Sequence, residues 1–222
     1  MSQPPARPQT TQKHALDWLR RAIVTGDLRP GDKIRQEDVA ERIGVSLVPV
    51  REALSALERE GQITYLPRRG YFVAELEGGD LDEIYDLRRV LESRSVRLAM
   101  QEMDDETVDR MVVAAGECSS ASAAGDVADE LGANRRFHFA LFEGAGQRHA
   151  LRLIRLLWDA TEPYRALYYN DPEERRASDE AHDRILDAVR ARDAERVVQE
   201  LDRHRDRARE TLKRILEPAG GA

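Results

Sequence analysis

Three of the five histidines in this sequence lie on helix faces that are otherwise apolar. In the stretch NRRFH, Asn134 and His138 are four residues apart and continue a stripe that starts at Val127, so both side chains should face a core and adjoin each other. The same spacing places His182 and His204 among aliphatic residues on two later helices. Imidazole nitrogens and amide oxygens bind divalent metals, so the pattern raises the question of a metal site.

A single histidine on an apolar helix face is more often a core residue with a hydrogen-bond partner than a metal ligand. Three of them on three helices weaken that explanation, because each buried imidazole without a partner would cost about 1 to 3 kcal/mol. One shared metal would satisfy all three rings. We therefore predict a divalent metal site, with zinc, nickel, manganese or iron as candidates. The other two histidines, His14 and His149, are expected to be surface or packing residues.

Arg88 is a candidate for anion binding in the same region. It shares a helical stripe with Ile84, Leu91 and Ser95, so its side chain should point inward. A guanidinium group can hold a carboxylate through two parallel hydrogen bonds, so an inward Arg88 is a candidate for binding an anion. The alternative is an ion pair with Glu92 on the helix surface.

The elements that would position these residues are helices. From residue 81 to residue 216 apolar residues recur with a helical period, with breaks near Gly125, near 144–146, at 170–172 and at 192–193. We expect six helices in this part of the chain. The acidic runs MDDETVD and DPEER are predicted to be solvated helix starts.

A Gly-Gly pair in ELEGGD separates this helical part from the front of the chain. The front begins with a helix that ends at Gly26, followed by two helices joined by the tight connection GVS, in which Ser46 can cap the second helix and Pro49 lies in its first turn. Then ITYLPRRGYFVAEL predicts a β-hairpin with a basic tip at 67–70. A helix-turn-helix followed by a hairpin is a winged helix, in which the second helix can enter the major groove of DNA.

Composition agrees with a mainly α protein, because 41% of the 222 residues are hydrophobic, 35% are charged and only 5% are aromatic. The net charge of -7 is unevenly divided: residues 1–75 carry +2 and the remainder -9, so nucleic-acid binding would be confined to the front. The opening MSQPPARPQTTQ is not a signal peptide, and no segment approaches the roughly 18 apolar residues of a membrane span. With Cys118 as the only cysteine, we expect a cytoplasmic protein that does not bind membranes.

The stretch RRAIVTGDLRPGDKIRQEDVAERIGVSLVPVREALSALEREG, together with RRG in the hairpin, resembles the DNA-binding domain of the GntR transcription regulators over about 60 residues. Arg51 is the leading candidate for reading a base, because a guanidinium group can bind a guanine edge through two hydrogen bonds; a surface ion pair with a glutamate is the alternative. The residues expected at the DNA are Arg35, Ser46, Leu47, Val48, Arg51, Arg68, Arg69 and Gly70.

The recognition helix departs from the GntR pattern at two positions. Leu47 stands where arginine is common, and Val48 where threonine, serine or isoleucine is common. Leucine cannot read guanine but can contact a thymine methyl group, so we expect an operator read there by apolar contact or by shape. Arg35, Arg68 and Arg69 are candidates for phosphate or minor-groove contacts, and Gly70 would let the hairpin tip approach the backbone closely.

The stretches LDEIYDLRRVLESRSVRLA, NRRFHFALFEGAG and EAHDRILDAVRARDAERV, with a last helix bearing His204, resemble the FCD ligand-sensing domain of the FadR branch of GntR proteins. Six helices fit its VanR-like subgroup better than the seven-helix FadR-like one. The resemblance implies homodimerisation through this domain, an effector-binding role for Arg88, and a metal site. The implied metal ligands are Asn134, His138, His182 and His204, with Asn134 in place of the usual aspartate.

The asparagine bears on both the metal and the effector. An amide oxygen is a weaker, neutral ligand, so metal affinity would fall or the site would be empty. With one negative charge fewer, a metal-bound site would have a formal charge of about +2 and would attract an anionic effector more strongly.

The predicted organisation is a tail at 1–12, a winged helix-turn-helix domain at 13–75, a linker at 76–80, an FCD-like effector-binding and dimerisation domain at 81–217, and a tail at 218–222. The predicted function is that of a homodimeric regulator, more often a repressor in this family, which binds a short inverted repeat in double-stranded DNA and responds to a small organic acid bound near the metal. One alternative is a constitutive DNA-binding protein with a degenerate sensor site, which Asn134 keeps open. The other is a metalloenzyme, although no motif places a general base.

Overall fold

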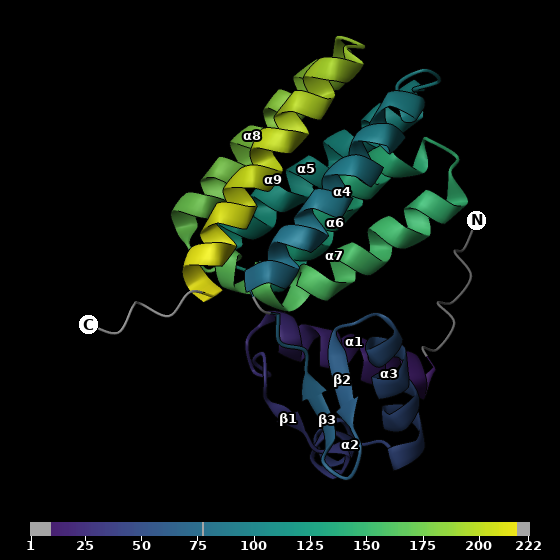
Figure 1. Ribbon diagram of the computed structural model, residues 1–222, viewed down its shortest axis with the longest axis vertical. Helices are drawn as coiled ribbons and strands as arrows, with labels where there is room; N and C mark the ends of the chain where they lie inside the picture. The colour runs from purple at the N-terminus through teal and green to yellow at the C-terminus, as the bar shows by residue number, and fades with distance from the viewer. Residues whose placement is uncertain (1–9, 77, 217–222) are drawn as a thin grey trace, which may run out of the picture. The chain divides into compact units, whose positions relative to one another are not determined.

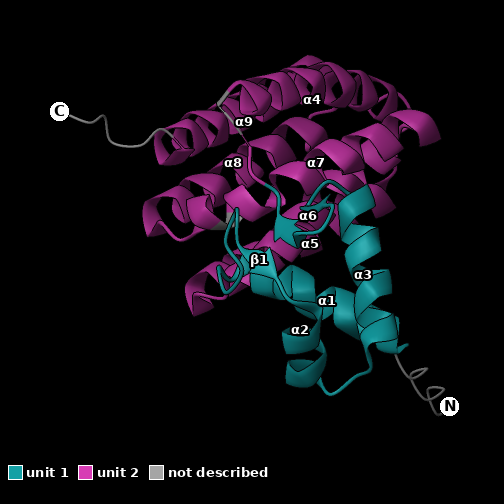
Figure 2. Cartoon of the chain, turned by 60° about the horizontal axis from the view of Figure 1, so that its bottom comes forward, with its two compact units in different colours: residues 1–74 teal, residues 75–222 magenta. Residues whose placement is uncertain are grey.

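The computed structural model describes residues 10–76 and 78–216. The chain divides into two compact units, residues 1–74 and 75–222, which Figure 2 colours separately. Each unit has its own core of buried apolar side chains. None of the helices in the described ranges is long and apolar enough to cross a membrane.

The first unit is a winged helix (Figure 1). Its elements, in chain order, are α1 (Thr11–Val24), β1 (Lys33–Ile34), α2 (Gln36–Ile43), α3 (Leu47–Arg59), β2 (Ile63–Leu66) and β3 (Gly70–Val73). The strands form an antiparallel sheet in the order β1, β3, β2, and the predicted hairpin is formed by β2 and β3, with Leu66 opposite Gly70. The strand β1 was not expected, because two residues are too few to produce a period in the sequence.

The helix-turn-helix is formed by α2 and α3. α2 ends at Gly44, whose φ of 68° lies in the left-handed region that glycine adopts without a steric penalty. Ser46 occupies the N-cap position of α3, but its side chain makes no capping hydrogen bond, so that part of the prediction is wrong. The inner face of α3 buries Val50, Leu54 and Leu57 completely.

The second unit is a bundle of six helices within the described residues, as predicted (Figure 1). They are α4 (Gly78–Ala99), α5 (Asp105–Ala124), α6 (Val127–Glu143), α7 (Arg148–Tyr169), α8 (Pro172–Arg190) and α9 (Ala194–Leu216). The two acidic runs are helix starts: Asp104 caps α5 by accepting a hydrogen bond from the backbone N–H of Thr107, and Asp171 caps α8 in the same way from Glu173.

The predicted boundaries differ from the helix ends in two places. The Gly-Gly pair begins α4, so residues 78–80 of the predicted linker are helical. α1 begins at Thr11, inside the predicted tail of 1–12. Residues 1–9 of that tail, and the predicted tail at 218–222, lie outside the described residues.

Candidate functional site

Helices α6, α8 and α9 bring His138, His182 and His204 together in the helical unit. Each ring offers one nitrogen, and these nitrogens lie within 4.8 Å of one another. His138 and His182 are buried and His204 is partly buried. Helical spacing therefore located three rings that the fold does place side by side.

The cluster contains polar atoms without partners. Among the described residues, both ring nitrogens of His138, Nδ1 of His182 and Nδ2 of Asn134 are buried and have no hydrogen-bond partner. Leaving a buried polar group unsatisfied costs about 1 to 3 kcal/mol, and several in one place call for a further group that binds them.

Asn134 is fully buried beside His182, with its Oδ1 atom 3.0 Å from Nε2 of that ring. One arrangement is a hydrogen bond in which Nε2–H donates to Oδ1, which leaves Nδ1 of His182 with its lone pair free. The distance also suits two adjacent ligand atoms, because bonds of about 2.1 Å in an octahedral metal site place neighbouring ligands about 3 Å apart. The amide can therefore serve as a ligand or orient the ring.

Burial lowers the pKa of all three imidazoles. The pKa of His182 falls to about 3, first through burial and then through the positive charge of Arg165. For His138 and His204 the pKa also lies well below the usual value, through burial first and then the neighbouring rings. The rings are neutral at pH 7, which is the form that binds metals, and three imidazoles with an amide oxygen suit a divalent transition metal.

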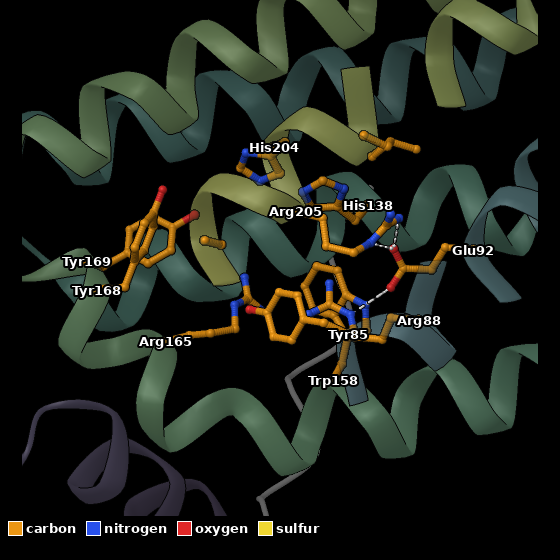
Figure 3. Close-up of a pocket in the computed structure, with 12 residues that line it drawn as sticks. Tyr85, Arg88, Glu92, His138, Trp158, Arg165, Tyr168, Tyr169, His204 and Arg205 are labelled. Carbon is orange, nitrogen blue, oxygen red and sulfur yellow. Dashed lines mark hydrogen bonds and ion pairs between the residues drawn. The ribbon is translucent and has the colours of Figure 1, made fainter. Parts of the chain in front are cut away.

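Beside the histidines, Glu92 is the centre of a buried ion-pair cluster (Figure 3). Its carboxylate accepts hydrogen bonds from Nε of Arg88 at 2.8 Å, from Nη2 of Arg205 at 2.7 Å and from Nε1 of Trp158 at 2.7 Å. Burial alone would raise the pKa of Glu92, but the two guanidinium groups outweigh it and lower the pKa to about 2. Arg88 thus points inward as its spacing predicts, and its ion pair with Glu92 is buried rather than on the surface.

Arg165 of α7 is a buried cation that the sequence reasoning missed. It is 7% exposed, and its guanidinium carbon lies 4.3 Å from the centre of the Trp158 ring. Within the described ranges its guanidinium group forms no hydrogen bond or ion pair with another residue. A signal was present, because Trp158, Arg165 and Tyr168 share one helical stripe and the argument that turned Arg88 inward applies to them equally.

Tyr85 and Arg165 line a cavity enclosed by α4, α6, α7 and α9, together with the Glu92 cluster and the rings of His138 and His204 (Figure 3). The hydroxyl group of Tyr85 is buried and has no hydrogen-bond partner among the described residues. The free space in the cavity is about 20 Å³, which is room for about one water molecule. A larger ligand can enter only if the lining side chains move apart.

A second candidate surface lies at the start of α3 in the first unit. Ser46, Val48 and Arg51 are exposed, Val48 by 61%, and Nε of Arg51 donates a hydrogen bond to Oε1 of Gln36 at 2.8 Å. Gln36, which sequence reasoning did not single out, therefore orients Arg51 from α2. Leu47 is only partly exposed because it packs against the core of the unit.

The hairpin tip and Arg35 provide the other predicted contacts. Arg35, Arg68 and Arg69 are exposed, and Arg35 is the N-cap residue of α2. Arg68 has a φ of 65°, a conformation that costs a non-glycine residue about 1 to 2 kcal/mol. Gly70, with a φ of 97°, adopts a conformation that residues with a Cβ atom avoid.

Comparison with known proteins matches both units. Residues 11–73 match the family model "Bacterial regulatory proteins, gntR family", and residues 83–207 match the FCD domain. The uncharacterized HTH-type transcriptional regulator YdhC of Bacillus subtilis strain 168 is 30% identical over 200 residues, which cover 90% of this chain and 89% of that protein. The HTH-type transcriptional repressor GlaR of Escherichia coli K12 is 28% identical over 84% of this chain and 89% of its own length. The solved structure of E. coli McbR/YncC matches with a TM-score of 0.82 and 25% identity over 94% of this chain and 100% of that chain.

Proposed function

Because the chain belongs to the GntR family of bacterial regulatory proteins and carries an FCD domain, we propose that it is a transcriptional regulator whose DNA binding is controlled by a divalent metal and a small carboxylate effector in the helical unit. Its relatives are regulators and not enzymes, so the metalloenzyme alternative is set aside. The observation that carries the sensor role is the set of buried imidazole nitrogens without partners beside a cavity lined by arginines.

For DNA binding, we assign α3 to the major groove and the hairpin of β2 and β3 to the flanking backbone or minor groove. Arg51 would read a base, held in place by Gln36, and Val48 supplies the apolar contact that the sequence suggested for Leu47. Arg35, Arg68 and Arg69 would bind phosphates, with Gly70 allowing close approach.

Two copies of the winged helix would read a short inverted repeat, which requires a homodimer. The helical unit offers apolar side chains for such a contact on two helices that pack against each other: Leu87 and Val90 of α4, and Leu153 and Leu156 of α7, are between 44 and 67% exposed. A second copy of the chain is the occupant we assign to this surface.

The proposed metal ligands are His138, His182 and His204, with Asn134 as a fourth ligand or as the residue that orients His182. When bound, the metal would act as a Lewis acid that accepts an oxygen atom of the effector. Burial within the chain keeps the imidazoles neutral. The cavity beside His138 and His204 is lined by guanidinium groups.

Helix α7 connects the cavity to the start of the helical unit. Arg165 lines the cavity, and the hydroxyl of the adjacent Tyr164 accepts a hydrogen bond from the backbone N–H of Leu76 at 2.5 Å. Leu76 lies just before α4, in the segment that continues the chain from the winged helix. An effector that favours a different position of α7 would therefore shift the population of arrangements of this segment, and with it operator affinity.

The metal content of the purified protein tests the proposed metal site. Protein purified without added metal should contain close to one divalent metal per chain, and His182→Ala should lose most of it. His149→Ala is the matched control, because His149 is exposed and outside the cluster. Equal and negligible metal in wild type and His182→Ala would remove the metal from the proposal while leaving DNA binding untouched.

A constitutive DNA-binding protein is the second candidate, and the contact between Asn134 and His182 is the observation that favours it. A hydrogen bond there satisfies one nitrogen without any metal, as expected of a sensor that has lost its ligand set. Thermal denaturation with a panel of carboxylic acids, with and without a chelator, decides between the two. A rise in melting temperature that the chelator abolishes supports the sensor, and no metal-dependent rise with any acid supports the constitutive protein.

A further inference from the structure

Arg165 differs from the other arginines of the cavity in its ion pairing. Arg88 and Arg205 share the carboxylate of Glu92, and Arg205 also pairs with Asp202. Arg165 has no carboxylate partner among the described residues, although it is 7% exposed and contacts the face of Trp158. A buried cation without a counter-charge is costly, so the cavity lining favours an anion at this position.

The hydroxyl group of Tyr85 gives a second and independent indication. Tyr85 is 2% exposed and its hydroxyl is unpartnered, and in the view of Figure 3 that hydroxyl points toward the end of the Arg165 side chain. A guanidinium group and a hydroxyl group together offer N–H and O–H donors, which is the set that a carboxylate accepts.

We propose that the effector is a small dicarboxylate, with one carboxylate at the metal and the other bound by Arg165 and Tyr85. This rests on the proposed metal and effector site and narrows the class of ligand. A divalent metal with neutral ligands and Arg165 together carry three positive charges inside the bundle. A monocarboxylate leaves two of them uncompensated and a dicarboxylate leaves one, so the lower cost of buried charge selects the dianion.

Binding also requires room, since the cavity as it stands holds about one water molecule. Arg165 lies two residues after Pro163, which is inside α7 and has no backbone N–H to donate to the preceding turn. The end of α7 that carries Arg165 therefore has fewer hydrogen bonds holding it than a regular helix, and it can move outward to admit the acid.

The test compares acids with the same number of carbon atoms. Full-length protein loaded with zinc is titrated calorimetrically with malonate and propionate, and with succinate and butyrate. For wild type we expect the diacid of each pair to bind about 10- to 100-fold more tightly, the range of a charge-assisted hydrogen-bonded pair. Arg165→Gln should bring this ratio close to one with little change for the monoacids, and Tyr85→Phe should lower it about fivefold.

The control variant is Arg155→Gln, because Arg155 is also on α7 but is exposed and paired with Glu143; its ratio should equal that of wild type. Zinc content and melting temperature are measured for every variant. Equal affinities of wild type for diacid and monoacid, or an equal loss for both in Arg165→Gln, would overturn the dicarboxylate assignment alone. Failure of zinc-loaded wild type to bind any of the four acids would overturn the proposed effector function as well. The ratio of diacid to monoacid affinity is measured on the wild type itself, so the proposal can be overturned even if Arg165→Gln misfolds.

Discussion

At the scale of single residues, Glu92 joins three helices of the bundle through one carboxylate. It lies on α4 and binds Arg88 of the same helix, Trp158 of α7 and Arg205 of α9. Both guanidinium groups are buried with it. A buried ion pair of this kind adds little net stability while both partners are present. Removing one partner is strongly destabilising, because the other charges are then buried without compensation.

We therefore expect Glu92→Gln to lower the free energy of unfolding by about 3 to 5 kcal/mol, because it leaves Arg88 and Arg205 without their shared counter-charge. Urea denaturation at one fixed protein concentration measures the change. Glu195→Gln is the control, because Glu195 pairs with Arg97 on the exposed surface, where solvent screens the ion pair, and the free energy of unfolding should stay close to that of wild type. Similar losses in the two variants would contradict the role assigned to Glu92.

Glu130 is a buried acid with the opposite behaviour. It is 1% exposed, and within the described residues neither carboxylate oxygen has a hydrogen-bond partner. Burial raises its pKa to about 7, against the opposing charge of Arg175. The folded protein therefore holds this proton between about pH 4.5 and pH 7 while the unfolded chain has lost it, so the contribution of Glu130 to stability falls as pH rises through 7.

Glu130→Gln should remove this pH dependence. Between pH 5 and pH 8 the wild type should lose on the order of 1 to 3 kcal/mol more stability than the variant, because one pKa unit corresponds to about 1.4 kcal/mol. Melting temperatures and urea midpoints of both proteins at the two pH values give the comparison. Parallel changes in the two proteins would mean that Glu130 is ionised in the folded state.

Spacing predicted the direction of side chains and named Glu92 as a possible partner of Arg88. It turned Asn134, His138 and Arg88 inward, since a helical period is visible in one sequence. It could not reveal that the pair of Arg88 and Glu92 is buried and shared with Arg205, because Arg205 comes from a helix more than 100 residues later. The packing of Leu47 against the core is likewise a tertiary contact with no local signature.

At the scale of elements, α5 contains one glycine in its interior and ends at another. Gly116 lies mid-helix and Gly125 is the C-cap residue with a φ of 72°. A Cβ atom added at either position would meet nothing within 4 Å, so sterics with neighbours do not separate them. Only the backbone conformation differs.

The same substitution should thus have opposite effects at the two sites. Gly116→Ala should stabilise the protein by about 0.5 to 1 kcal/mol through helix propensity, and Gly125→Ala should destabilise it by about 1 kcal/mol, because alanine resists the left-handed conformation. Thermal and urea denaturation of the two variants side by side measure this. A shift of the same sign in both would contradict the capping geometry of α5.

Most elements could be predicted from the sequence because they are long and periodic or end in a strong turn signal. The helix-turn-helix, the hairpin and the six helices of the second unit belong to this class. The Gly-Gly pair at the start of α4 misled the prediction of a linker, because glycine disfavours a helix by only about 1 kcal/mol per residue and the tertiary packing of α4 outweighs that. The bounds of the functional domains themselves stay a prediction.

At the scale of the whole molecule, the proposed homodimer can be separated from folding by a charge placed on an exposed helix face. Val90 of α4 is 67% exposed and Val113 of α5 is 60% exposed, so neither should be needed for the fold of the chain. Only Val90 belongs to the surface assigned to the second copy.

Val90→Glu should shift the protein from dimer to monomer in light scattering coupled to size-exclusion chromatography, because two copies of the new charge would meet near the symmetry axis. Val113→Glu should remain a dimer with unchanged mass. DNA binding of Val90→Glu should weaken in parallel, since a monomer reads one half-site. A dimeric Val90→Glu together with a monomeric Val113→Glu would place the contact between copies on α5.

In the proposed sensor, the narrow cavity between Tyr85, Trp158 and Arg165 would set the rate of effector binding as well as its affinity. If entry of the acid must wait for the end of α7 to move, the observed association rate cannot keep rising with acid concentration and levels off at the rate of opening. A brief pulse of the acid, however concentrated, would then cause no response. Only an acid that persists for longer than the opening time would change the binding of the protein to its operator.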